Sequence, residues 1–420
     1  MQVINDDFHK NYWTNAQFHP LREHGGAGPA GSKCSTFDGH CTGYAGLDDY
    51  SITRDSFLRP MPGSAAASEG YKAFAAEVNR TIDALAVVPP LASVLAAHPG
   101  LKEQADLNKL HLENDKLRLT FSPRTGAVDS LLEKATGIDW AANRSIGEFV
   151  YRTYTQDSDY DRYVCQFTSS YCGTGIHHKN KSGDFAGVFW NKPGMDASIL
   201  SDPTMAHLLP LSNISRAWDV RLARAWKDED AATMLLQLRL PVDTVKFFGG
   251  MSDIYLNVTL EPVSTADALE DAAVAISLSW TNKTATRLAE SSWLLLSPAV
   301  PTPNTSETVS NWRMDVLGHP VDPLSVVYNG SRHFHAVHRG VCYDDATTRL
   351  AIETIDAPLV APGDAAHLLD FDNELPDLDG GWAFSLHNNA GWDASSPYWY
   401  DKDATFGFRV RINPRKNWCW

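Results

Sequence analysis

The spacing of hydrophobic positions along the chain changes near residue 110. From Tyr71 to Leu85 apolar residues recur every three or four positions, the period of a helix with one buried face. The Ala-rich stretch that follows keeps this character until Pro99, where the proline ring should end a helix. The pattern predicts a helical segment over 67–109, with its first helix packed on the domain that follows. Residues 1–66 lack periodicity and are predicted to be irregular.

After residue 110 the pattern alternates between polar and apolar positions, the period of a half-buried strand. Lys116 to Phe121 alternates first, a turn follows at 123–126, and a second run continues from Ala127. Further runs lie at 148–155, 233–240, 254–262, 274–280, 293–298, 333–343, 349–355, 382–389 and 406–412. Because almost no helical pattern separates them, they predict one large antiparallel β-sandwich over 110–420 rather than parallel βαβ units.

Composition narrows the function classes. The chain carries 51 acidic and 36 basic residues, so its net charge of −15 disfavours binding to nucleic acid or to an anionic membrane surface. No apolar run reaches the roughly 20 residues that cross a bilayer, so no membrane association is predicted. Gly-rich phosphate loops, HExxH and Gly-x-Ser-x-Gly are absent from the sequence, which excludes common nucleotide-binding, metalloprotease and hydrolase classes.

Glycosylation sequons are more frequent than chance predicts. Eight asparagines open an Asn-x-Ser/Thr triplet, against about three expected from Ser/Thr frequency. They are Asn79, Asn143, Asn180, Asn213, Asn257, Asn282, Asn304 and Asn329. Because such triplets are modified in the secretory route, we expect a secreted or secretory-pathway glycoprotein. The start of the chain lacks a basic and apolar leader, so we expect the signal peptide to be missing from this chain.

The six cysteines fit the same compartment. Cys34 and Cys41, and likewise Cys165 and Cys172, share the spacing C-x6-C in segments rich in small and polar residues. We predict a disulfide in each pair, with reduced buried thiols as the alternative. Cys342 and Cys419 could form a third pair. A zinc site is disfavoured because no C-x2-C spacing occurs.

Candidate chemistry is concentrated near the C-terminus. The segment HNNAGWDASSPYWY, 387–400, combines amides with aromatic rings, and the chain holds 13 tryptophans. Sugars are bound by stacking on aromatic rings while amides and carboxylates take the hydroxyls. A cap of aromatics over the end of a sandwich would give the same composition. His333 and His335 share a strand face, but without a third ligand or a located carboxylate they predict no metal site.

Three charges stand between two tryptophans in WTNKTATRLAESSW, from Trp280 to Trp293. Lys283, Arg287 and Glu290 lie where a strand should begin, and each would be costly to bury without a partner. An Arg287–Glu290 pair could hold the loop against a neighbouring domain or face a sugar cleft. We favour the structural role because arginine is common at ion-paired interfaces.

Several segments together resemble domain-of-unknown-function family 5054, whose members are similar to family 38 glycoside hydrolases of the α-mannosidase type. The matching segments are TFSPRTGAVDSLLEKATGIDW, WTNKTATRLAESSW, WRMDVLGHPVDP, NGSRHFHAVHRGV, ETIDAPLVAPG and SLHNNAGWDASSPYWYDKDATFGFRVRI. The resemblance covers about residues 68–420 and implies a galactose-mutarotase-like supersandwich over 110–420.

The resemblance also implies a catalytic (β/α) domain before the helices, which this chain lacks. Metal ligands and the nucleophilic carboxylate would belong to that missing domain, so no metal or cofactor is expected here. We expect a carbohydrate-binding portion, inactive as an isolated chain, that partners a catalytic domain encoded upstream. Candidate substrate-binding residues are Arg287, Glu290, His335, Asn388, Asn389, Trp392 and Tyr400.

Two alternatives stay open at this point. One is an independent epimerase or polysaccharide lyase on the same fold, using His335 or His387 with a carboxylate or tyrosine as an acid/base pair. The other is a non-catalytic carbohydrate-binding module. Fold alone does not choose between them, because one sandwich can host several chemistries.

Overall fold

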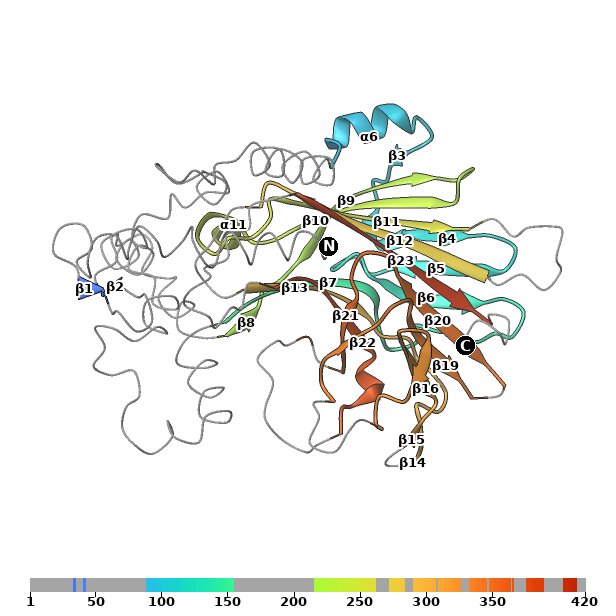
Figure 1. The fold of residues 1–420 in the computed structure, drawn as a ribbon. Coiled ribbons are helices and arrows are strands. Elements are labelled where there is room, and N and C mark those ends of the chain that lie inside the picture. Colours follow the sequence, from blue (N-terminus) through green and yellow to red (C-terminus); the bar gives the residue numbers. More distant parts are fainter. Residues whose placement is uncertain are drawn as a thin grey trace, which may run out of the picture. The chain divides into compact units, whose positions relative to one another are not determined.

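The computed structural model divides into two units, whose described helices and strands are drawn in colour in Figure 1. The structure describes residues 33–34, 41–42, 88–154, 215–261, 272–283, 290–306, 309–325, 332–345, 347–363, 365, 375–388 and 403–413. One unit comprises 1–87 and 180–187, and the strands β1 (Lys33–Cys34) and β2 (Cys41–Thr42) are its described part. The other unit comprises 88–179 and 188–420.

The larger unit contains a ten-stranded sheet. In spatial order its strands are β17 (His319–Val321), β16 (Trp312–Val316), β19 (Gly340–Asp344), β20 (Arg349–Thr354), β23 (Ala404–Ile412), β12 (Ala272–Thr281), β11 (Asp253–Leu260), β10 (Thr233–Arg239), β9 (Arg221–Asp228) and β3 (Lys102–Glu103). A pair of short strands, β14 (Asn304–Ser306) and β15 (Val309–Ser310), forms a separate hairpin.

A nine-stranded sheet forms the second layer. Its order is β18 (His335–Ala336), β21 (Leu359–Pro362), β22 (Trp382–Asn388), β13 (Glu290–Leu296), β7 (Ile146–Thr153), β6 (Val128–Glu133), β5 (Leu117–Phe121) and β4 (His111–Glu113), with β8 (Arg216–Ala217) paired to the end of β7. All strand pairs among the described residues are antiparallel, and neither sheet closes on itself.

One hydrophobic core fills the space between the two sheets. Strand β11 shows how the sequence builds it, because residues from Asp253 to Leu260 alternate between half-buried and fully buried positions. Leu256 of the ten-stranded sheet and Phe149 and Leu294 of the nine-stranded sheet belong to the same cluster. The prediction of a mainly antiparallel β-sandwich is therefore confirmed.

Helices are few in the described part of the chain. They are α6 (Leu91–Ala97), α11 (Val242–Phe247) and the 3-10 turns η3 (Leu107–Lys109) and η6 (Leu378–Gly380). Helix α6 ends before Pro99, as predicted. The helical run from Tyr71 to Leu85 lies outside the described residues, and the division into 1–66, 67–109 and 110–420 stays a prediction. No described helix combines the length and apolarity that crossing a bilayer requires.

The hairpin β1–β2 places two cysteines opposite each other. Cys34 and Cys41 are register partners in an antiparallel pair. Directly opposite residues have Cα atoms about 4.5–5.5 Å apart, which lies within the range that a disulfide spans. The register supports the predicted Cys34–Cys41 disulfide, whereas Cys165, Cys172 and Cys419 lie outside the described residues.

We expect non-reducing peptide mapping to recover Cys34 and Cys41 in one linked species. Each loop of this length should stabilise the fold by about 2–3 kcal/mol through the unfolded chain. Two alkylatable thiols at these positions in protein secreted from a eukaryotic host would contradict the prediction.

Gly340, at the start of β19, approaches its neighbouring strand too closely for any side chain. Its φ is +146°, and an added Cβ would lie 1.9 Å from the carbonyl oxygen of Ile352. We expect Gly340→Ala to lower the free energy of unfolding by about 2–4 kcal/mol, because both the φ and the contact must change. Gly318→Ala is the matched control, since Gly318 also has a positive φ but an added Cβ meets nothing within 4 Å. Equal urea midpoints for the two variants would show that the close approach has no cost.

Candidate functional site

Three strand ends meet at one end of the nine-stranded sheet. Strand β7 ends where β13 begins, with Thr153 opposite Glu290, and β22 ends beside them, with Asn388 opposite Ser291. We call this region, made of Tyr151–Tyr154, Glu290–Trp293 and Leu386–Asn388, the loop end. Segment 284–289 comes directly before the loop end in the sequence, at Glu290, and segment 389–402 comes directly after it, at Asn388.

A buried ion pair lies at the centre of the loop end. The Nζ atom of Lys283 is 2.7 and 2.8 Å from the two carboxylate oxygens of Glu290, and neither side chain is exposed to solvent. Lys283 Nζ also donates to the carbonyl oxygen of Gly249 at 2.9 Å. The hydroxyl of Tyr151 donates to Glu290 Oε2 and lies 2.6 Å from the carbonyl oxygen of Phe248. The pair is thus surrounded by hydrogen-bonding groups, which is what makes a buried charge tolerable.

This network joins the two layers of the sandwich. Lys283 follows β12 of the ten-stranded sheet, whereas Glu290 and Tyr151 belong to β13 and β7 of the nine-stranded sheet. Phe248 and Gly249 follow helix α11, so their carbonyl groups point from its C-terminal end. Burial, and next the charge of Glu290, raise the pKa of Tyr151 well above its ordinary value. Tyr151 therefore stays protonated and keeps its proton available for Glu290.

A second cluster lies on the outer face of the same strands. The hydroxyl of Ser291 is 2.8 Å from the hydroxyl of Tyr154 and accepts from Trp293 Nε1 at 2.7 Å. Trp293 also contacts Phe334 edge to face, with ring centroids 6.0 Å apart. Arg152 donates to the carbonyl oxygen of Ala365 at 2.8 Å. The loop end is therefore polar and aromatic on one face and ionic on the other.

The structure brings two of the predicted substrate-binding residues together. Glu290 and Asn388 both lie at the loop end, within one residue of each other in register. Glu290 has no exposed surface, and its carboxylate is engaged by Lys283 and Tyr151, so in this arrangement it supports the loop end from inside. Asn388 is exposed. Arg287, Asn389, Trp392 and Tyr400 lie outside the described residues, and so does any contact of Arg287 with Glu290.

His335 lies far from this region. Its register partner is Val360, which pairs with Phe384, which pairs with Leu294. His335 is thus three strands and four residues from Glu290, or roughly 20 Å at about 4.8 Å per strand and 3.4 Å per residue. It is half-buried, and its Nε2 is 2.8 Å from the carbonyl oxygen of Arg332. Burial lowers the pKa of His335, with the charge of His333 acting in the same direction and the hydrogen bond opposing.

His387, the other histidine of the acid/base hypothesis, lies at the loop end itself. It is buried opposite Ser292, and Ser292 is opposite Tyr151, so three polar side chains share one row across three strands. Glu290 lies in the next row on the same face. The Ser292 hydroxyl has no hydrogen-bond partner among the described residues.

Lys283 and Tyr151 are the residues that the sequence pattern did not assign. Lys283 was recognised as a charge needing a partner, and that partner is Glu290, seven positions further along the chain. Tyr151 sits in a run of alternating strand residues and carries no local signal of its role. In the described parts of the chain, no group of three or more His, Cys, Asp and Glu side chains is arranged to hold a metal ion.

The described sequons differ in exposure. Asn143 and Asn282 are exposed, with positive φ of 57° and 56°, whereas Asn257 is half-buried in the middle of β11. Asn304 begins β14. Asn79, Asn180, Asn213 and Asn329 lie outside the described residues.

Solved structures with a similar arrangement include three of interest. An α-mannosidase from Enterococcus faecalis V583 matches with a TM-score of 0.38 and 12% identity, covering 74% of this chain and 30% of that one. A glycosyl hydrolase family 38 protein from Enterococcus faecalis matches with a TM-score of 0.36 and 10% identity, covering 74% of this chain and 31% of that one. A galactose mutarotase-like protein from Lactobacillus casei ATCC 334 matches with a TM-score of 0.35 and 9% identity, covering 72% of this chain and 99% of that one.

This chain spans less than a third of the length of the two mannosidase-family structures. No family model matches the sequence, and no curated protein matches it. The expected membership of family 5054 therefore stays a prediction.

We expect Lys283→Met to lower the free energy of unfolding by about 3–5 kcal/mol, because it leaves the Glu290 carboxylate buried without its partner. Lys283→Met/Glu290→Met should be more stable than either single variant, since no unpaired charge then remains. Arg224→Met, which breaks the exposed pair with Glu103, is the control and should change stability little. Urea denaturation of the four variants measures the coupling. Additive effects of the two buried substitutions would contradict the network.

Proposed function

We propose that this chain is the C-terminal β-sandwich portion of an α-mannosidase-like glycoside hydrolase, and that it binds carbohydrate at the loop end. One observation carries the proposal. The exposed Asn388, and the strand residues that flank the segments with Arg287 and Trp392, are anchored side by side around a buried ion pair. Binding groups work best on rigid elements whose supports are themselves fixed, and the loop end provides that support.

Hydrolysis is assigned to a separate catalytic domain. A glycosidase needs two carboxyl groups, or a carboxylate and a metal, about 5–10 Å apart around the scissile bond. Glu290 is the buried carboxylate of the loop end, and Lys283 and Tyr151 engage it, which suits a supporting role rather than that of a nucleophile or acid. The catalytic (β/α) domain would supply the metal and the nucleophile, and this chain would supply contacts to the sugar.

We also propose passage through the secretory route, with N-linked glycans. The density of sequons and the facing positions of Cys34 and Cys41 support it.

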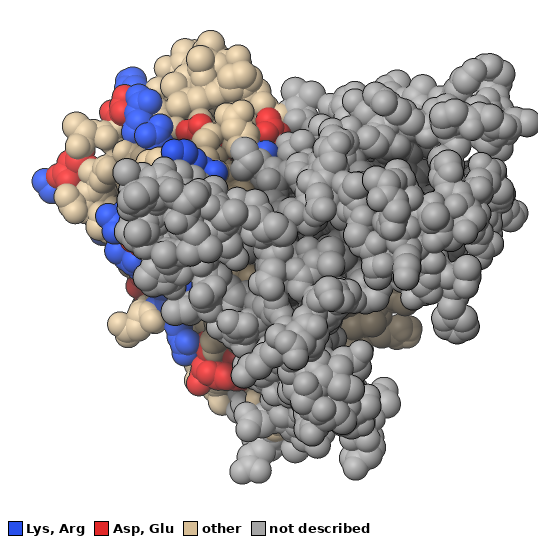
Figure 2. All heavy atoms as spheres, turned by 90° about the vertical axis from the view of Figure 1, so that its left-hand side faces the viewer, with Lys and Arg blue, Asp and Glu red and all other residues tan. Residues whose placement is uncertain are grey.

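Basic and acidic side chains are interspersed on the described surface that Figure 2 shows, which suits a neutral ligand such as a sugar better than a polyanion.

The purified chain should show no turnover of aryl mannosides or other aryl glycosides, with or without added zinc or calcium. It should bind methyl glycosides and mannose-containing oligosaccharides, and a titration that follows tryptophan fluorescence measures the affinity. Trp392→Ala and Asn388→Ala should each weaken binding about tenfold, the effect of losing roughly 1.4 kcal/mol. Leu317→Ser, at an exposed turn of the other sheet, is the control. Robust metal-dependent turnover would overturn the division of labour, and unchanged affinities would overturn the loop end as the binding site.

A polysaccharide lyase or epimerase is a second candidate on one observation. Tyr151, Ser292 and His387 share a row, and Glu290 lies in the next row, so His387 is two strands, or roughly 10 Å at about 4.8 Å per strand, from Tyr151. Lyase activity on uronic-acid polysaccharides produces an unsaturated sugar that absorbs in the ultraviolet. Its appearance with the native chain and its loss in His387→Gln would favour this candidate over the accessory role.

A further inference from the structure

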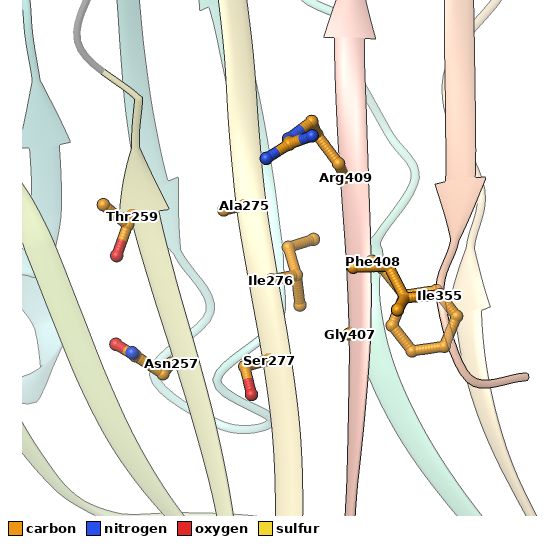
Figure 3. A pocket seen from close by; sticks show the side chains of 9 residues that line it. All are labelled: Asn257, Thr259, Ala275, Ile276, Ser277, Ile355, Gly407, Phe408 and Arg409. Carbon is orange, nitrogen blue, oxygen red and sulfur yellow. The ribbon is translucent and has the colours of Figure 1, made fainter.

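The outer face of the ten-stranded sheet contains a pocket of about 180 Å³ (Figure 3). It lies on the face of the sheet opposite the core, and strands β11, β12 and β23 form its floor. Its lining residues are Asn257, Thr259, Ala275, Ile276, Ser277, Ile355, Gly407, Phe408 and Arg409.

The pocket is a trough across four chain segments. Asn257 is opposite Ser277, and Ser277 is opposite Gly407, whose carbonyl oxygen accepts a hydrogen bond from the backbone of Ile355. Because Ser277 has a small side chain and Gly407 has none, little fills the space between Asn257 and Ile355 (Figure 3). Ile355 is 71% exposed and offers an apolar wall.

Arg409 borders the trough in the next row, where its side chain extends over Ala275 (Figure 3). Its guanidinium is already held by two carboxylates, Glu261 at 2.8 Å and Glu353 at 3.4 Å. Because the two carboxylates already restrain the guanidinium, a further polar group can bind to it with little additional loss of side-chain entropy. The trough thus combines a preset polar edge with an apolar wall, the combination that sugar rings require.

Asn257 is a lining residue of the trough that can be modified covalently. It opens the sequon Asn257-Val258-Thr259, and the period of the strand places Asn257 and Thr259 on the same outer face. The Oδ1 atom of Asn257 is buried and has no hydrogen-bond partner among the described residues. A buried polar atom without a partner carries an energetic cost that a ligand could remove.

We propose that Asn257 carries an N-linked glycan whose first N-acetylglucosamine lies in this trough, against Ile355. The proposal rests on the proposed passage through the secretory route. There Nδ2 of the unfolded chain loses a proton and forms a bond to C1 of a lipid-linked oligosaccharide, while the bond from C1 to the phosphate oxygen breaks and the lipid diphosphate leaves with the electron pair. After folding, the attached sugar extends over Ser277 and Gly407, with its polar groups toward Arg409 and its apolar face toward Ile355.

The test compares protein secreted from a eukaryotic host with the same chain made in a host that does not glycosylate. Glycopeptide mass spectrometry reports occupancy at each sequon. Thr259→Ala removes the acceptor sequence while Asn257 stays in place, and it should lower the melting temperature of the secreted protein by about 2–4 °C more than that of the unglycosylated protein. Asn143→Gln, at an exposed turn, is the matched control and should give the same small change in both.

Ile355→Ala tests whether the attached sugar packs against Ile355 or is only attached at Asn257. Because Ile355 is exposed, its truncation should leave the unglycosylated protein unchanged and lower the melting temperature of the glycosylated one. Gly407→Ala should act similarly, since an added Cβ would narrow the trough beside Ile355, 3.0 Å from its Cδ1.

The possible outcomes distinguish the proposals. Occupied Asn143 or Asn282 with an empty Asn257 would overturn this inference and leave the secretory proposal standing. An absence of glycans at every sequon would overturn both. A glycan at Asn257, with equal effects of Ile355→Ala in the two hosts, would overturn the packing of its first sugar in the trough.

Discussion

The ion pair of Lys283 and Glu290 is the interaction on which the arrangement of the loop end depends. A charge in a protein interior is tolerated only when its partners are correctly placed, so small displacements there are costly. Lys283 meets that requirement with Glu290 and with the carbonyl oxygen of Gly249. As a result, the end of β12, the start of β13 and the end of helix α11 are fixed relative to one another within the sandwich. A hydrophobic contact at the same place would hold them together without specifying their geometry.

The two faces of the sheets serve different purposes. Facing inward, large side chains such as Trp280, Leu256 and Phe384 form one continuous core. Facing outward on the ten-stranded sheet, small residues such as Ser277 and Gly407 leave room above the backbone. Since alternate residues of one strand face opposite sides of the sheet, an outward-facing residue can be substituted without changing the side chains that fill the core.

Most strands could be predicted because their inward residues alternate, as in β11 and β23. Strand β13 begins three residues earlier than its apolar run, because Glu290, Ser291 and Ser292 are polar and yet buried. Strand β9 was missed since Ala225 to Lys227 are consecutive buried positions without alternation. The loop end could be foreseen in part, through Glu290 and Asn388. The partners of Glu290 could not, because Gly249 and Tyr151 are distant in sequence and only the fold brings them together.

Both sheets are open, and each ends in a very short strand. The ten-stranded sheet ends in β3, which consists of Lys102 and Glu103, and in β17, which contains Pro320. The nine-stranded sheet ends in β4 and β18, of three and two residues. A proline cannot donate to another strand, and charged or very short edges offer little backbone to a second molecule. The edges that the described strands form therefore offer little backbone for edge-to-edge pairing with a second molecule, which disfavours the growth of fibrils.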